Sequence, residues 1–214
     1  PRFRPPQTIY RETPRTSAEG YVEYTLPKPC WAVMRFLVEP LGRREGVRFT
    51  SRVSTDKIAA KYQKEVERTI PKALEQGLLG WEVTDLAITL VEGEDHEIHS
   101  RPSDFVLATP MGIMDALNKS GTLLLEPLLA FDITVPEEFG SRILGDLVQM
   151  RGEFESPRIQ GGIFEVSGVV PAEAAMEYHV RLGILSGGTG RMTTRFGGYR
   201  ECPVQKQISR PRIG

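Results

Sequence analysis

The stretch LLLEPLLAFDITVPEEFGSRILGDLVQMRG, residues 123–152, decides the fold of the second half of the chain. Its first fourteen residues are mostly apolar, which is typical of a buried strand. Pro136 then begins a helix whose first turn carries Glu137 and Glu138. Proline favours the first helical position, and acidic side chains favour the positive end of the helix dipole. The stretch therefore predicts a strand followed directly by a helix.

The residues after this stretch extend the pattern to strand, helix, strand, strand, helix, strand. FESPRI and GIFEVSGVV form a strand pair around QGG, Pro171 begins a second helix, and GRMTTRFGGYRECP is the closing strand. This β-α-β-β-α-β order is that of a ferredoxin-like fold. We therefore place a ferredoxin-like domain at residues 122–204, a boundary near Ser120–Thr122, and a C-terminal tail at residues 205–214.

The first half of the chain, residues 1–121, predicts strands with a long helix among them. Apolar residues recur every four positions along that helix and give it one apolar face: Ile58, Tyr62, Val66, Ile70 and Leu74. Strands are expected at Tyr21–Leu26, Trp31–Leu41, Val47–Val53 and Trp81–Gly93. The whole chain is thus expected to be an α+β protein of two domains, a β-rich α/β domain followed by the ferredoxin-like one.

The ends of the helices in the first half are also predicted by their residues. Ser54 or Thr55 is expected to cap the long helix, because their side chains can accept a bond from a free backbone N–H. A second helix is expected around Asp104–Lys119. Thr109-Pro110 is typical of a helix start, so we expect that second helix to be broken there.

The strand directions of the first domain would bring three loops together. If the strands alternate and the helix packs back along them, the loops at Pro27–Cys30, Ser54–Lys57 and Glu92–Arg101 lie at one end. The lengths agree, since a helix of about 21 residues spans roughly 31 Å and ten strand residues span roughly 33 Å. We therefore predict an elongated domain with a three-loop tip.

The third of these loops, EGEDHEIHSRP, holds His96 and His99 among four carboxylates. The histidines are three residues apart, whereas HExxH needs four on one helix, and Gly93 and Pro102 indicate a loop. An acid–base centre needs burial to tune its pKa values, and an exposed loop does not provide it. We interpret the segment as an exposed charged turn without a metal; a metal-dependent enzyme centred on the two histidines is the alternative.

Composition restricts the class of protein. The net charge is -1, with 40% apolar and 26% charged residues, so a nucleic-acid partner would be bound by local patches and DNA is not expected. The two cysteines, Cys30 and Cys202, form no disulfide framework or zinc set and indicate a reduced, cytoplasmic protein. No apolar run approaches transmembrane length, so no membrane partner is expected. The chain begins without Met, so we expect it to be part of a longer protein.

The glycine-rich segment LSGGTGR, Leu185–Arg191, has the composition of a phosphate-binding loop. It lacks G-x-x-x-x-G-K-[ST] and follows a helix, whereas a phosphate-binding loop follows a strand and precedes a helix. We interpret it as a helix-to-strand turn. The chain itself is therefore not expected to be an enzyme or to bind a nucleotide cofactor.

Several segments together resemble a known family. The chain is similar to the fourth and fifth domains of translational GTPases related to elongation factor G, and most similar to the ribosomal protection proteins of tetracycline resistance. The resemblance runs from about Tyr10 to Val204. It is carried by YRET, SAEGYVEYTL, ALEQGLLGWEVTDLAITL, RPSDF, GTLLLEPLLAFDITVPEEF, GDLVQMRG, VPAEAAMEY and GGYRECP, in that order.

The resemblance implies a ribosomal partner. The first domain would have the ribosomal protein S5 domain 2-like fold, and its tip loops would contact 16S rRNA near the decoding site. The second domain would face the large-subunit factor site, and GTP and magnesium would belong to an upstream GTPase domain. We expect a monomer. The implied contact residues are Pro27, Lys28, Pro29, Ser54, Thr55, Lys57, Asp95, His96, Glu97, Ile98, His99 and Ser100.

The third loop departs from the drug-resistance pattern. That branch carries adjacent tyrosines and a Ser-Pro-Val tip, where this chain has Asp95–His99. His96 instead falls on a histidine of elongation factor G itself. Translocation or ribosome recycling is therefore an alternative to drug protection. A third hypothesis is a stand-alone scaffold whose ferredoxin-like half binds a peptide or a small regulator.

Overall fold

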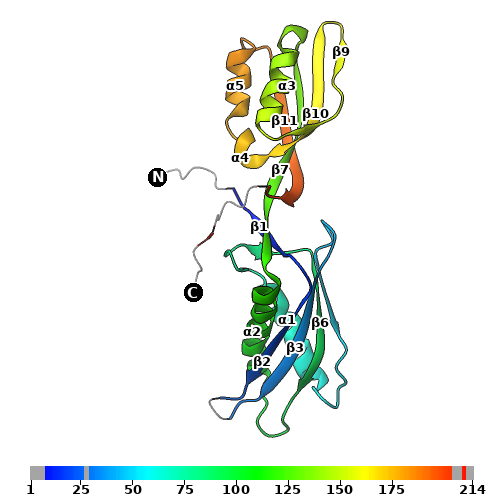
Figure 1. Ribbon diagram of the computed structural model, residues 1–214, viewed down its shortest axis with the longest axis vertical. Helices are drawn as coiled ribbons and strands as arrows, with labels where there is room; N and C mark the ends of the chain where they lie inside the picture. The colour runs from blue at the N-terminus through cyan, green and yellow to red at the C-terminus, as the bar shows by residue number, and fades with distance from the viewer. Residues whose placement is uncertain (1–7, 27–28, 204–208, 211–214) are drawn as a thin grey trace. The chain divides into compact units, whose positions relative to one another are not determined.

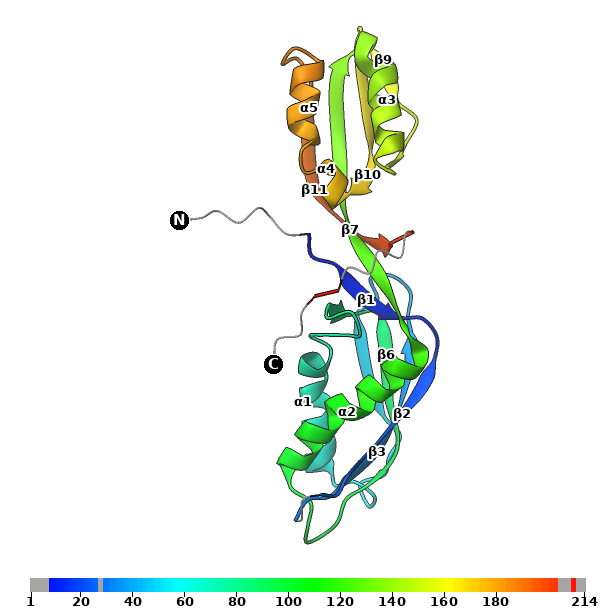
Figure 2. The same ribbon diagram turned by 60° about the vertical axis from the view of Figure 1, so that its left-hand side comes forward.

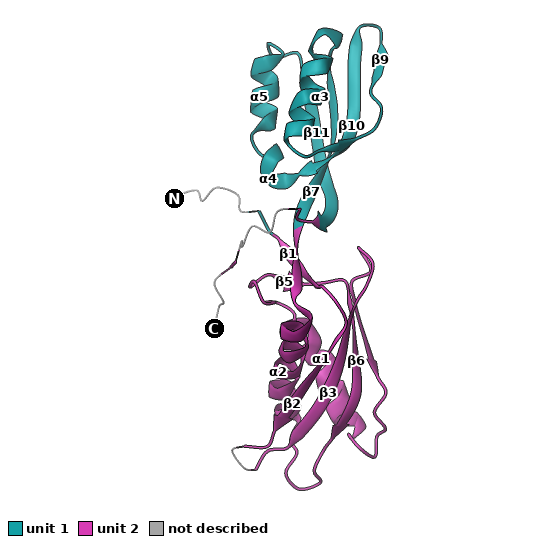
Figure 3. Cartoon of the chain, viewed as in Figure 1, with its two compact units in different colours: residues 1–9, 126–200 teal, residues 10–125, 201–214 magenta. Residues whose placement is uncertain are grey.

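The computed structural model describes residues 8–26, 29–203 and 209–210. The chain forms two compact units (Figure 3). One comprises residues 10–125 and 201–214, and the other residues 1–9 and 126–200. The predicted boundary near Ser120–Thr122 falls at the turn between helix α2 (Pro102–Ser120) and strand β7 (Thr122–Pro136).

The larger unit is built on a four-stranded sheet in the order β2-β3-β6-β4. Its strands are β2 (Ala18–Tyr24), β3 (Ala32–Pro40), β6 (Leu86–Glu94) and β4 (Val47–Ser51). β3 is antiparallel to β2 and to β6, and β4 is parallel to β6. The predicted strand directions are therefore confirmed: β2, β4 and β6 all end at the same end of the sheet.

The predicted long strand Trp81–Gly93 is wrong in one respect, because it is two strands. β5 (Glu82–Val83) pairs with β1 (Arg11–Pro14), which also pairs with the start of β7, and β6 begins after a turn at Asp85. Asp85 has a φ of 56°, which is left-handed backbone and ends the extended run. Its carboxylate accepts the N–H of Gly46 at 3.0 Å, so the break also fixes the connection between β3 and β4, which lie on either side of β6.

Two helices cover one face of this sheet (Figures 1 and 2). α1 (Ala60–Ala73) buries Tyr62, Val66 and Ile70, which confirms the predicted apolar face. The predicted cap at Ser54 or Thr55 is wrong, because α1 begins after Ala59 and no side chain at that position caps it. The N–H of Ala59 is instead bound by a carboxylate from another loop, described below.

Helix α2 is continuous, so the predicted break at Thr109-Pro110 is wrong. A proline inside a helix removes one backbone hydrogen bond. Here Phe105 before it and Ile113 and Leu117 after it are fully buried in one core, and this packing holds both halves in line. Where α2 crosses β2, a Cβ added at Gly20 would collide with the backbone oxygen of Gly112, so the two elements touch backbone to backbone.

The smaller unit has the ferredoxin-like order that the sequence predicts. β7 pairs with β10 (Ile163–Pro171) on one side and β11 (Arg191–Glu201) on the other, and β8 (Glu153–Phe154) and β9 (Arg158–Gln160) lie beside β10. α3 (Gly140–Gln149) and α5 (Tyr178–Leu185) lie on one face of this sheet (Figure 2).

Two details of the smaller unit differ from the prediction. The first helix begins with a 3-10 turn, η1 (Glu137–Phe139), and the second is divided into α4 (Ala172–Ala175) and α5. The segment LSGGTGR joins α5 to β11, which confirms the helix-to-strand turn. Gly187 and Gly188 have φ values of 60° and 84°, which side chains with a Cβ rarely adopt.

A buried carboxylate anchors the smaller unit. Glu126 is only 4% exposed and accepts hydrogen bonds from Arg151 at 2.8 and 2.9 Å and from Arg200 at 2.9 Å. Burial alone would raise the pKa of Glu126, but the bonds from the two guanidinium groups outweigh it and hold that pKa below its usual range. The carboxylate therefore stays ionised at neutral pH and ties β7 to β11.

Among the described residues, no helix has the length and apolar character needed to span a membrane.

Candidate functional site

The loops at the end of the four-stranded sheet are joined by hydrogen bonds. The N–H of Asp95 donates to the carbonyl of Lys57 at 2.8 Å, and its carboxylate accepts the N–H of Ala59 at 2.7 Å. The Ser100 hydroxyl donates to the carbonyl of Trp31 at 2.6 Å. These bonds tie the loop after β6 to the loop after β4 and to the loop before β3. The predicted convergence of three loops at one end is therefore confirmed (Figures 1 and 2).

The third loop is also held from within. The N–H of His96 donates to the Ser100 hydroxyl oxygen at 2.8 Å, and the N–H of Ser100 donates to the carbonyl of His96 at 2.9 Å. The His96 Nδ1 atom accepts the N–H groups of Ile98 at 3.2 Å and His99 at 3.4 Å. An accepting Nδ1 carries no proton, so the neutral ring has its proton on Nε2. These hydrogen bonds give the loop one defined shape.

Exposure separates the predicted contact residues of the third loop into two groups. Ile98 is 78% exposed, and Glu97 is exposed beside it. His96 and His99 are half-buried. Ser100 is 8% exposed and uses its side chain inside the protein. Asp95 likewise binds the start of α1. The outer surface of the loop is therefore made by Glu97 and Ile98, with His96 at its side.

The other two loops contribute exposed residues. In the second loop, the carbonyl of Ser54 accepts the N–H groups of Lys57 and Ile58, both at 3.1 Å, and closes a turn. Ser54, Thr55 and Lys57 are all exposed. In the first loop, Pro29 is exposed, while Pro27 and Lys28 lie outside the described residues.

Three supporting residues were not predicted from the sequence. The ring of Trp31 lies 5.5 Å from that of His96, and the Tyr62 hydroxyl donates to the carbonyl of Ser100 at 2.9 Å. The Asp104 carboxylate accepts the N–H of Trp31 at 3.2 Å and that of Arg101 at 2.9 Å. Pro102 followed by an acidic residue two positions later is the pattern of a helix start, and it could have located Asp104.

The geometry argues against an enclosed chemical centre at the tip. His96 and His99 have ring centroids 4.4 Å apart, but Nδ1 of His96 is occupied by two backbone donors. Within the described ranges, no three His, Cys, Asp or Glu residues are placed to share a metal ion. What the tip offers is a shaped, hydrogen-bonded surface with an exposed aliphatic side chain.

Family models match both halves of the chain and assign the tip to a known domain. The family model for elongation factor G, domain IV, matches residues 6–121, and the model for the elongation factor G C-terminus matches residues 123–209. The chain belongs to the elongation factor G family. In the terms of that family, the tip is part of domain IV, and the ferredoxin-like unit is the C-terminal domain.

Relatives and a solved structure agree with this assignment. The tetracycline resistance protein TetP of Clostridium perfringens is 38% identical over 200 residues, covering 93% of this chain and 31% of TetP. The tetracycline resistance protein TetO of Campylobacter jejuni is 35% identical over 211 residues, covering 98% of this chain and 33% of TetO. The predicted resemblance to the tetracycline-resistance branch is confirmed.

A crystal structure of a Thermus thermophilus protein superposes with a TM-score of 0.83 at 28% identity, covering 92% of this chain and 30% of that one. The elongation factor G-like fold of both halves of the chain is therefore confirmed. The chain spans about a third of the length of these curated relatives.

Proposed function

We propose that this chain is the ribosome-binding C-terminal portion of a translational GTPase. Its three-loop tip enters the decoding region of the small subunit, as in ribosomal protection against tetracycline. The observation that carries the proposal is the exposed Ile98, 78% exposed on a loop whose backbone is fixed by hydrogen bonds. A large apolar side chain held outward on a rigid support is what a contact surface requires.

The tip residues have different roles in this proposal. Nε2–H of His96 donates a hydrogen bond to an acceptor on 16S rRNA, since Nδ1 is already used. Ile98 packs against a base or sugar, and Lys57 meets a phosphate. Asp95 and Ser100 hold the loop in shape. Lys28 is proposed as a second phosphate contact from the sequence alone.

The proposal also gives roles to the C-terminal domain and to a domain upstream of this chain. The C-terminal domain faces the factor site of the large subunit, and an upstream domain binds GTP and magnesium. The protein acts as a monomer in the cytoplasm, where its ribosomal partner is found. Identity of 38% to TetP and 35% to TetO supports tetracycline protection as the task.

A second function is favoured by one observation. The third loop has Asp95–His99. The resemblance implies adjacent tyrosines and Ser-Pro-Val at this place in the resistance branch, and it implies that His96 falls on a histidine of elongation factor G. Translocation or ribosome recycling is therefore the second candidate. Expression of the full-length gene in a sensitive host decides between them: raised tetracycline tolerance supports protection, and unchanged tolerance supports the second candidate.

The ribosome contact is tested with Ile98→Asp in the full-length protein. Burying an isoleucine contributes about 1.5–3 kcal/mol, and about 1.4 kcal/mol is a tenfold change in affinity. We expect affinity for the small subunit, measured by cosedimentation, to fall by about tenfold or more. The control is Val47→Asp at the start of β4, which is 44% exposed at the opposite end of the same sheet. Equal affinities for the two variants would contradict the proposal.

A further inference from the structure

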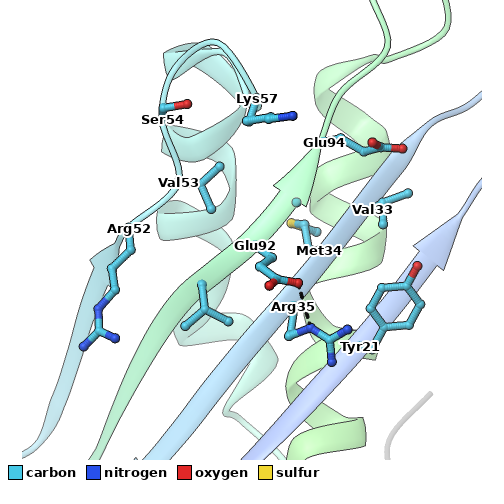
Figure 4. Close-up of a pocket in the computed structure, with 12 residues that line it drawn as sticks. Tyr21, Val33, Met34, Arg35, Arg52, Val53, Ser54, Lys57, Glu92 and Glu94 are labelled. Carbon is cyan, nitrogen blue, oxygen red and sulfur yellow. Dashed lines mark hydrogen bonds and ion pairs between the residues drawn. The ribbon is translucent and has the colours of Figure 1, made fainter.

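A cleft opens on the face of the domain IV sheet opposite the helices (Figure 4). Its volume is about 680 Å³. It lies where β4 ends at Ser51 and the chain from Arg52 to Lys57 leaves the sheet beside β6. A register shift between Arg35 and Phe36 marks a β-bulge in the pairing of β3 with β6 at the same place. Bulges of this kind re-aim side chains and often border binding sites.

The two rims of the cleft carry opposite charges. Arg52, Ser54 and Lys57 line one rim, and all three are exposed. Neither Arg52 nor Lys57 forms an ion pair with any residue that the structure describes. Glu94 is exposed across from them (Figure 4). The cleft therefore presents two cations without counter-ions facing a carboxylate.

The third side of the cleft is aromatic. Tyr21 is 42% exposed at the far end, and the Arg35 guanidinium lies over its ring at 5.2 Å. Arg35 is itself held by Glu92 at 3.1 Å and Glu19 at 3.6 Å. These ion pairs neutralise Arg35 and Glu92, so the charges left for a ligand are those of Arg52, Lys57 and Glu94.

We infer that this cleft binds a short stretch of single-stranded RNA, whose phosphates lie on Arg52 and on Lys57. Glu94 accepts a hydrogen bond from an exocyclic amino group of a base, and a neighbouring base stacks on the Arg35 guanidinium that lies over the Tyr21 ring. The inference rests on the proposed function, because the RNA is a strand that lies beside the tip. It extends the proposed RNA contact from the tip loop that holds Lys57 onto the open face of the sheet.

A nucleotide fits this cleft better than a peptide. A phosphodiester carries the negative charge that the Arg52 rim needs, and adenine, cytosine and guanine carry amino donors for Glu94. An acidic peptide would be attracted by Arg52 and Lys57 but repelled by Glu94. A basic peptide would be attracted by Glu94 but repelled by Arg52 and Lys57. Uracil has no exocyclic amino group, so the contact with Glu94 should make the cleft bind cytosine-containing RNA more tightly than uracil-containing RNA.

The test is fluorescence anisotropy of labelled hexacytidylate and hexauridylate with the 214-residue chain. We expect tighter binding of hexacytidylate, and we expect Glu94→Ala to remove that preference. Arg52→Glu should weaken binding of both RNAs by about tenfold and lower the dependence of log affinity on log salt by about one unit. The Arg52 side chain has no hydrogen-bond partner among the described residues, and a thermal unfolding scan confirms that the variant is folded.

The matched control is Arg68→Glu on α1. Arg68 is also exposed, and it lies on an element outside the cleft. Arg68→Glu changes the charge of the protein by the same amount as Arg52→Glu. Binding unchanged within about twofold in this variant supports the site. Equal losses in the Arg68 and Arg52 variants, equal affinity for the two RNAs, or displacement of RNA by hexaglutamate would each overturn it. The assay contains no ribosome, so its outcome is separate from that of Ile98→Asp, which tests the proposed function.

Discussion

Ser100 connects the third loop to two other parts of the tip. Its hydroxyl donates to the carbonyl of Trp31 and accepts the N–H of His96, and its own carbonyl accepts the Tyr62 hydroxyl. The residue is 8% exposed, so water cannot replace these partners freely. A buried polar group that loses its partner costs about 1–3 kcal/mol.

We therefore expect Ser100→Ala to lower the free energy of unfolding of domain IV by about 1–3 kcal/mol. Urea unfolding followed by tryptophan fluorescence measures this, because Trp31 lies at the tip and reports on it. Ser54→Ala is the control, since Ser54 is exposed and its change should stay within about 0.5 kcal/mol. Equal effects of the two changes would show that the Ser100 bonds do not hold the loop.

At the residue scale, the sequence predicts which residues are exposed better than it predicts their hydrogen-bond partners. The flanking Gly93 and Pro102 correctly indicate a loop rather than a metalloprotease helix. The role of Asp95 could not be predicted, because its carboxylate binds the N–H of Ala59, 36 positions earlier in the chain. Contacts of this kind depend on where the strands end in space, and no local pattern records them.

The contact of β2 with α2 determines how the elements of domain IV pack. A Cβ at Gly20 would collide with the Gly112 oxygen and lie 2.5 Å from the Ala116 nitrogen. Both neighbours are backbone atoms, which cannot rotate away as a side chain can. The strand and helix would have to separate to admit one methyl group.

We expect Gly20→Ala to destabilise domain IV by about 1–3 kcal/mol through this overpacking. Gly145→Ala on α3 is the contrast, because a Cβ there meets nothing within 4 Å. Alanine in a helix interior is favoured over glycine by about 0.5–1 kcal/mol, so that variant should gain stability. Thermal unfolding by circular dichroism distinguishes the two, and a stable Gly20→Ala variant would contradict the close approach.

At the element scale, periodicity predicts the elements and tertiary packing corrects their limits. The four-residue repeat from Ile58 to Leu74 correctly predicts α1, and the order of segments from residue 123 correctly predicts the ferredoxin-like unit. The continuity of α2 through Pro110 could not be predicted, because it depends on the core residues Phe105 and Ile113 on either side. The break at Asp85 depends on the separate partner that β1 provides for β5.

At the scale of the whole molecule, the chain combines two domains of the elongation factor G family. The sequence supports this through many short matches in order, which no single motif would provide. The tip geometry adds a physical reason for a large partner: a hydrogen-bonded loop that carries an isoleucine 78% exposed. The proposed tip contact with the ribosome is the central claim that follows.

Directed cleavage of 16S rRNA tests this claim most directly. A hydroxyl-radical source is attached to Ile98→Cys in the 214-residue chain, and the native Cys30 and Cys202 are buried. The control carries the source at Val47→Cys, at the opposite end of the sheet. We predict cleavage in the decoding region from position 98 and not from position 47. Absence of cleavage from position 98, or the same pattern from both positions, would contradict the account.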